Sequence, residues 1–175
     1  YDRALIKPDE ARARAAAVGL FTTPPSIVTL VPTARDATND ITWRYTTAVP
    51  AGEWTTASFG DATWSIGRGG FGTANTPGAI AGTTWNTPDI WIRRTFDLPA
   101  AVTTENPRLF VHHDEEAEVY INGVLALKIG GYSTDYELAA MTPEGRAALR
   151  PGRNTIAVHC HQTTGGQYID VGIVD

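Results

Sequence analysis

The sequence is poor in the residue types that several classes of protein require. Its single cysteine, Cys160, excludes any disulfide within the 175 residues. No apolar run approaches the ~20 residues that a membrane-spanning helix needs. The net charge is −5, the only lysines are Lys7 and Lys128, and the arginines are scattered among acids and threonines. Because nucleic acid is bound by clustered basic residues, this composition argues against a nucleic-acid partner.

The chain begins with YDRALIKPDE, which contains neither an initiator methionine nor the apolar core of a signal peptide. We therefore expect it to be a fragment or a processed piece of a longer protein. Pro8 suits the first turn of a helix and Gly19 suits its C-terminal cap. The residues between them are mostly alanine and arginine, with little apolar face to bury. We interpret residues 1–26 as a short linker helix or the tail of a preceding domain.

Residues 27–175 are dominated by short β-prone runs separated by glycine and proline. The runs predict strands at residues 28–31, 41–46, 90–98, 109–113, 117–121, 124–129, 155–161 and 168–174. Asn122-Gly123 predicts a two-residue hairpin turn, since both central positions of such a turn need positive φ. A second helix is expected at 142–149, with Pro143 at its start and Gly152 past its end. Many short strands with few helical turns favour one β-sandwich over residues 27–175.

Four motifs in this part of the chain resemble the sugar-binding domain of glycoside hydrolase family 2. They are WTTASFGDATW (54–64), DIWIRRTFDLP (89–99), DEEAEVYINGVLA (114–126) and LRPGRNTIAVHCHQ (149–162). The resemblance implies an all-β, galactose-binding-like jelly roll. It also implies a non-catalytic accessory domain, because the catalytic carboxylates of such enzymes sit on a separate barrel. The catalytic domain of the same polypeptide would then be a partner.

A narrower set of motifs, GGFGT, HHDE, NTIAVHCHQ and GGQYIDVG, resembles an appended domain of large bacterial hydrolase-like proteins, including some similar to glutaminase A. This resemblance favours a secreted or periplasmic location through the parent enzyme. Galactose-binding-like domains often carry a structural calcium ion, which would take oxygen ligands. No acidic loop motif of this sequence places such an ion, and we expect no other cofactor.

All four histidines lie in two motifs, HHD (112–114) and HCH (159–161). His159 and His161 alternate along a strand and point to one face, while Cys160 points to the other. With a third imidazole they could form a zinc site. The alternative is that the imidazoles hydrogen-bond buried backbone or carboxylates such as Asp114 and Asp170. We expect that alternative, and therefore no metal at the histidines.

The acids of DEEAE (114–118) could serve acid–base catalysis, which needs two carboxylates across a cleft. A contiguous acidic run is more typical of a solvated face on which one acid hydrogen-bonds the turn. Cys160 alternates away from its histidine neighbours, so it is expected to be a small buried apolar residue and not a nucleophile. The glycine-rich GRGGFGT (67–73) is followed by no helix, which argues against a phosphate loop and for a long surface loop. The sequence therefore predicts no catalysis.

Carbohydrate binding remains as the predicted function. Sugars are recognised by aromatic rings on their apolar faces and by polar side chains at their hydroxyls. We expect the loops GGFGT, TTWNTPD and GGYSTDYE to converge at one end of the sandwich and to bind the ligand through Phe71, Trp85, Asn86, Tyr132, Asp135 and Tyr136. The alternative is a structural docking domain that buries its aromatics against the catalytic domain and leaves an apolar patch when isolated.

Overall fold

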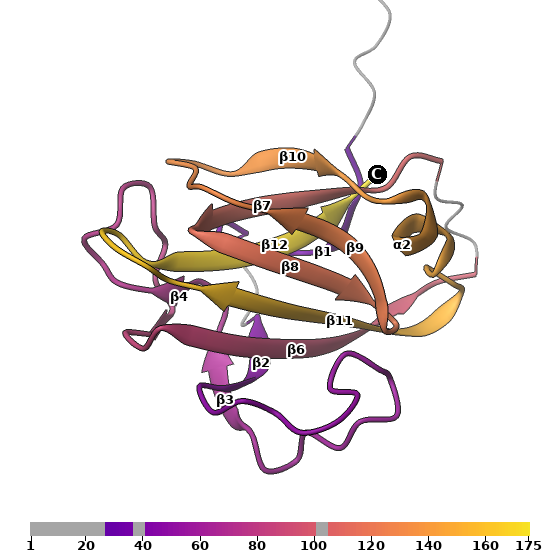
Figure 1. Cartoon of the computed structure of the whole chain (residues 1–175). Helices are drawn as coiled ribbons and strands as arrows, with labels where there is room; N and C mark the ends of the chain where they lie inside the picture. Colours follow the sequence, from indigo (N-terminus) through magenta and orange to yellow (C-terminus); the bar gives the residue numbers. More distant parts are fainter. Residues whose placement is uncertain (1–26, 37–40, 101–104) are drawn as a thin grey trace, which may run out of the picture.

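The computed structural model describes residues 27–36, 41–100 and 105–175, which form a sandwich of two sheets (Figure 1). The first sheet has the order β10 (Glu137–Ala140), β7 (Arg108–Asp114), β12 (Tyr168–Val174), β4 (Phe71–Gly72), β5 (Thr83–Thr84), and β1 (Thr29–Val31) also pairs with β12. The second has the order β3 (Ser65–Arg68), β2 (Thr42–Thr46), β6 (Asp89–Leu98), β11 (Gly152–His161), β8 (Glu116–Ile121), β9 (Val124–Ile129). Neighbouring strands are antiparallel except for the short parallel pair β4–β5.

The eight predicted strands are confirmed to within three residues at each boundary. They correspond to β1, β2, β6, β7, β8, β9, β11 and β12. The predicted all-β sandwich is therefore confirmed, with α2 (Pro143–Ala147) as the one helix of the described residues. The predicted N-terminal helix and the proposed boundary at residue 26 fall on residues outside the described ranges. No helix in the described ranges is long and apolar enough to cross a membrane.

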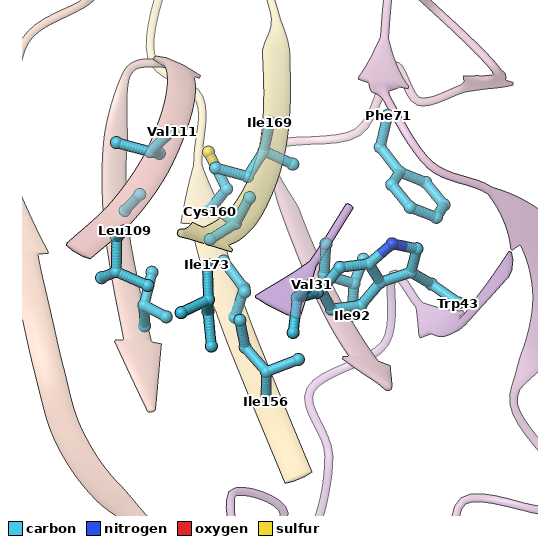
Figure 2. Close-up of a cluster of buried hydrophobic side chains, with 14 of the residues drawn as sticks. Val31, Trp43, Phe71, Ile92, Leu109, Val111, Ile156, Cys160, Ile169 and Ile173 are labelled. Atoms are coloured by element: carbon cyan, nitrogen blue, oxygen red, sulfur yellow. The ribbon is translucent and has the colours of Figure 1, made fainter. Parts of the chain in front are cut away.

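The hydrophobic core lies between the two sheets and takes side chains from both (Figure 2). Leu109, Val111 and Ile173 come from the first sheet, and Ile92 and Ile156 come from the second; all five are fully buried. Burial of such side chains contributes roughly 1.5–3 kcal/mol each to folding. Cys160 also lies in this core with no exposed surface, which confirms that it is a small buried residue. Burial raises the pKa of its thiol, so it is no nucleophile at neutral pH.

The predicted hairpin turn is confirmed between β8 and β9. Asn122 and Gly123 both have positive φ, at 50° and 91°. The Asn122 side chain also donates to Asn154 Oδ1 over 2.8 Å and accepts from the Thr155 backbone N–H at the same distance. The turn is thereby fixed to β11 as well as to its own two strands.

The predicted second helix forms, although it is shorter than expected. Thr142 caps α2, and its hydroxyl accepts a hydrogen bond from Gly145 N–H over 2.9 Å. Gly145 lets the helix approach β9 closely, because a Cβ at this position would lie 2.4 Å from Ala126 Cα.

The glycine-rich segment GRGGFGT is not the surface loop that the sequence predicts. It supplies the end of β3 and all of β4, and Phe71 is fully buried in the core. Gly72, at φ 158°, passes against β12, where a Cβ would meet the Gln167 carbonyl at 2.1 Å. The glycines allow this close strand contact, which leaves the Phe71 ring as the only large side chain of the segment to fill the core.

Candidate functional site

His159 and His161 lie on the outer face of the second sheet, as strand alternation predicts. His159 Nε2 is 2.8 Å and His161 Nδ1 is 2.9 Å from the same oxygen of Asp89, on the neighbouring strand β6. The His159 ring also stacks on Trp91, with the ring centroids 4.7 Å apart. Burial alone would raise the pKa of Asp89, but the hydrogen bonds and charges of the two histidines hold it below its ordinary value.

The same outer face continues across β8 and β9 with further paired charges. Glu118 accepts hydrogen bonds from Lys128 Nζ over 2.7 Å and from the Tyr120 hydroxyl over 2.8 Å. The Lys128 hydrogen bond lowers the pKa of Glu118, and burial of Tyr120 beside that carboxylate raises the phenol pKa to about 12. The charged groups on this face thus hold one another in place.

His112 and His113 are buried at the end of β7, where their rings meet backbone carbonyls. His112 Nε2 is 3.2 Å from the Ser133 carbonyl, and His113 Nδ1 is 2.6 Å from the Glu115 carbonyl. All four imidazoles thus bond backbone or carboxylate, as expected. The carboxylates that we named, Asp114 and Asp170, are wrong as partners. Within the described ranges, no three histidine, cysteine, aspartate or glutamate residues are grouped so that they could hold a metal ion.

Three of the six residues predicted to bind ligand are buried. Phe71 is 0%, Trp85 2% and Tyr136 9% exposed. The expectation that these rings lie open on loops is therefore wrong, because each fills space that a loop encloses. The Trp85 indole N–H donates to Thr87 Oγ1 over 3.0 Å, so this ring anchors the turn before β6.

Tyr136 belongs to a buried polar network centred on Asp170. Its hydroxyl donates to Asp170 Oδ2 over 2.7 Å and lies 3.1 Å from the Tyr168 hydroxyl. Asp170 also accepts from the backbone N–H groups of Ala34 and Gly70, over 2.6 and 3.3 Å. Burial raises the pKa of Asp170, and these donors partly offset that rise. The network joins four separate segments of chain and is structural.

The three expected loops do meet at one end of the sandwich, on the left of Figure 1 where β11 ends and β12 begins. Trp85 N–H donates to the Gly72 carbonyl over 3.2 Å, which joins TTWNTPD to GGFGT. Gly70 of GGFGT and Tyr136 of GGYSTDYE both donate to Asp170, which joins the first loop to the third. Gly78, between the first two loops, passes so close to the third that a Cβ would lie 2.1 Å from the Thr134 carbonyl. The Gln167 side chain donates to the Thr87 carbonyl over 2.7 Å and ties in the loop before β12.

A cavity of about 320 Å³ opens at this end, and we call it the end cavity. Of the three expected loops only GGYSTDYE lines it, together with Pro77, the end of β7 and the loop before β12. Its exposed aromatic ring is Tyr132, which is 71% exposed. Apart from Tyr132, its lining is polar or small. The lining residues are Pro77, Asp114, Glu115, Tyr132, Ser133, Thr134, Thr164, Gly165 and Gly166. The end cavity is our candidate site, because it combines an open ring with hydroxyls and carboxylates.

The backbone that carries Tyr132 is fixed although its ring is free. Ser133 N–H donates to the His113 carbonyl over 2.9 Å, and Ser133 Oγ accepts from His113 N–H over 3.3 Å. Tyr132 itself forms an isolated antiparallel bridge with Asp114. The preceding Gly131 has φ 75°, a value that glycine adopts without strain. Because the backbone at Tyr132 is already ordered, little conformational entropy of the backbone is lost when the ring binds a ligand.

The other two predicted residues lie outside the end cavity. Asn86 is exposed and lines a second hollow, of about 360 Å³, beside Tyr45, Trp64 and a group of threonines. The two hollows share no lining residue. Asp135 is 3.1 Å from Arg35 NH1 and forms an exposed ion pair. The structure thus does not gather the six residues at one site.

Sequence reasoning missed Asp114 as a site residue and treated the acidic turn as self-bonded. Glu115 Oε2 instead accepts from the Thr163 N–H over 3.0 Å and also from its hydroxyl, which holds the loop before β12. Asp114 is 7% exposed, and no described residue donates a hydrogen bond to its carboxylate. Burial raises its pKa, the Glu115 charge adds to the rise, and His113 opposes it. The signal in the sequence was an acid followed by loops rich in serine, threonine and glycine.

No protein-family model matches the sequence, and no curated protein sequence matches it. Solved structures do match. A β-glucuronidase from glycoside hydrolase family 2 matches 87% of this chain with a TM-score of 0.55 and 18% identity. The β-glucuronidase of Bacteroides uniformis matches 85% with a TM-score of 0.55 and 20% identity, and that of Bifidobacterium dentium matches 82% with 0.53 and 19%. The chain spans 18%, 18% and 22% of those three chains. It therefore has the fold of a domain within family 2 glycoside hydrolases and only a part of their length.

Proposed function

We propose that the chain is a non-catalytic accessory module of a larger carbohydrate-active or related hydrolase, and that it binds carbohydrate at the end cavity. The observation that carries the proposal is Tyr132, which is 71% exposed on the rim of a cavity of about 320 Å³ that also contains hydroxyl and carboxylate groups. An exposed ring on an ordered backbone can stack on the apolar face of a pyranose. Hydroxyls of Ser133, Thr134 and Thr164 lie in the same lining and can pair with sugar hydroxyls.

The likeness to family 2 structures supports the accessory role. The chain corresponds to roughly a fifth of those proteins, and the family resemblance implies that the catalytic carboxylates lie on another domain. The end cavity has two carboxylates, but that of Glu115 already accepts a hydrogen bond from the Thr163 N–H. Asp114 therefore lacks a free partner with which to share acid–base work.

Docking to a catalytic domain is the competing role, and an exposed apolar patch would support it. The exposed large apolar residues are instead distributed over several elements. They are Ile27 and Val28 before β1, Val49 after β2, Ile66 in β3, Ile80 before β5, Val124 and Leu125 in β9, Tyr132 before β10, and Leu138 in β10. No single element of the described residues carries a large apolar face, and this favours binding over docking.

Calorimetric titration of the 175-residue chain with neutral plant and algal oligosaccharides tests the proposal. A shallow site of this kind should bind at about 10–1,000 µM, or roughly −4 to −7 kcal/mol. Tyr132→Phe keeps the ring and should retain most of the affinity, whereas Tyr132→Ala should lose at least tenfold. Absence of binding at millimolar sugar, or equal binding by Tyr132→Ala, would refute the proposal and favour docking.

A further inference from the structure

The charge of the end cavity limits which carbohydrate it can hold. Among its lining residues Asp114 and Glu115 are acidic, and none of the lysines, arginines and histidines that the structure describes lines it. His113 is the basic residue nearest to Asp114 in the sequence. Its side chain is 2% exposed, and its Nε2 lies 3.6 Å from Glu137 Oε1. A ligand in the end cavity therefore meets two acidic side chains and no described basic side chain in the lining.

Asp114 has an unused hydrogen-bonding capacity that points to a donor on the ligand. The residue is 7% exposed, and its carboxylate accepts no hydrogen bond from the described residues. The other buried carboxylate of the described residues, Asp170, accepts hydrogen bonds from Tyr136 and from two backbone N–H groups. Neither Asp114 oxygen is among the buried polar atoms that lack a partner, so both keep some exposed surface. A hydroxyl group of a ligand in the end cavity can therefore donate to this carboxylate.

The loop before β12 is shaped around this carboxylate. Gly166 faces it so closely that a Cβ would lie 2.3 Å from Asp114 Oδ2 and 3.0 Å from Thr76 Cγ2. Glycine at this position therefore leaves the carboxylate room on the cavity side. Glu115 fixes the same loop through Thr163, so the opening does not depend on the ligand for its shape.

We infer that the end cavity selects a neutral sugar residue, whose hydroxyl groups donate to Asp114, and excludes sugars that carry a carboxylate or sulfate. This inference rests on the proposed carbohydrate binding and adds the ligand's charge class. Two like charges within a few ångströms repel, and they do so more strongly where protein replaces water around them. Tyr132 provides the stacking surface for either kind of sugar, so the selection is made by the carboxylates.

The test compares three forms of one sugar against the 175-residue chain. The first is a neutral oligosaccharide that binds, the second is the same oligosaccharide with its C6 hydroxyls oxidised to carboxylates, and the third is the methyl ester of the second. The ester keeps the shape of the acid without its charge. We expect the acid to bind at least tenfold more weakly than its ester.

Asp114→Asn is the decisive variant, because it removes one charge and keeps the shape of the side chain. It should reduce the ratio of the two dissociation constants, acid over ester, at least threefold. Asp97→Asn is the matched control, since it removes an exposed charge at the other end of β6 and should leave this ratio unchanged. Thermal unfolding of each variant checks that it is folded.

The outcomes separate the two proposals. Equal affinity for acid and ester, or a ratio that Asp114→Asn leaves unchanged, overturns the charge selection while the carbohydrate-binding proposal stands. Binding that needs added calcium and is lost in EDTA also overturns it, because the carboxylates would then hold a cation and not the sugar. Absence of binding by any of the three sugars, and by the wider neutral panel, overturns the proposed function itself.

Discussion

The outer face of the second sheet and the loop end of the sandwich are both acidic, but they use their carboxylates differently. On the sheet face, Asp89 holds His159 and His161, and Glu118 holds Lys128 and Tyr120. At the loop end, Asp114 is more deeply buried than either and accepts no hydrogen bond from a described residue. The comparison indicates that the number and proximity of acids do not identify a candidate site. We chose the candidate site by a carboxylate that lies in a cavity and accepts no hydrogen bond from a described residue.

Two aromatic rings at the loop end give the first and largest test of this comparison. Trp85 is 2% exposed and Tyr132 is 71% exposed. Trp85→Ala should lower the free energy of unfolding by about 3–5 kcal/mol, because it opens a cavity in the core. Tyr132→Ala should change it by less than about 0.5 kcal/mol, as for other exposed side chains. Urea denaturation measures both, and similar losses in the two variants would contradict the division between core ring and binding ring.

Asp170 extends the comparison to a carboxylate that is buried and fully engaged. Asp170→Ala should lower the free energy of unfolding by about 3 kcal/mol, since it leaves the N–H groups of Ala34 and Gly70 and the Tyr136 hydroxyl without their acceptor. Tyr136→Phe removes a single donor and should lower it by about 1 kcal/mol. A loss below 1 kcal/mol in Asp170→Ala, measured in the same urea titration, would show that the network contributes little.

Asp89→Asn and Asp114→Asn should change stability in opposite directions. Asp89→Asn weakens a paired carboxylate and should lower the free energy of unfolding by about 1 kcal/mol at pH 7. Asp114→Asn removes an unpaired buried charge and should raise it by up to about 1 kcal/mol. Thermal and urea unfolding of both variants would detect the difference. Destabilisation of similar size in both would show that Asp114 has a partner in the folded protein.

The pH dependence of those two variants sharpens the same contrast. The pKa of Asp89 is lowered in the fold, so its contribution is present above the unfolded pKa and is lost as pH falls through the lower folded value. The pKa of Asp114 is raised in the fold. Ionisation of Asp114 therefore destabilises the folded protein at a pH above this raised pKa. It has no effect on stability below the pKa of Asp114 in the unfolded chain, near pH 4. The advantage of Asp114→Asn should therefore vanish between neutral pH and about pH 4. An advantage that persists at pH 3 would contradict the assignment.

Most of the fold could be predicted from the sequence because residues close together in the chain determine most of its strands and turns. The strands β6, β8 and β11 are long runs of alternating or β-branched residues, and Asn122-Gly123 specifies its own turn. The strands missed are short or atypical in composition. They are β4 and β5 with two residues each, β3, which contains Gly67, and β10, which is ELAA. Their pairing is decided by neighbours distant in the sequence, which no local window records.

The site was harder to predict because it depends on which rings the sandwich buries. Phe71, Trp85 and Tyr132 all stand beside glycine or threonine in the sequence, and nothing local separates them. Phe71 fills the core because Gly72 lets β4 approach β12. Tyr132 stays outside because Ser133 ties its loop to the end of β7. Long-range packing makes this selection.

We propose above all that carbohydrate binds in the end cavity. An NMR titration of the 175-residue chain with a neutral oligosaccharide tests it most directly, because backbone amide shifts report where a ligand lies. The account predicts shifts confined to the residues around Asp114, Tyr132 to Thr134 and Thr164 to Gly166, which line the end cavity. Shifts centred instead on Trp64 and Asn86 in the second hollow, on His159 and His161, or on no residue at all would contradict it.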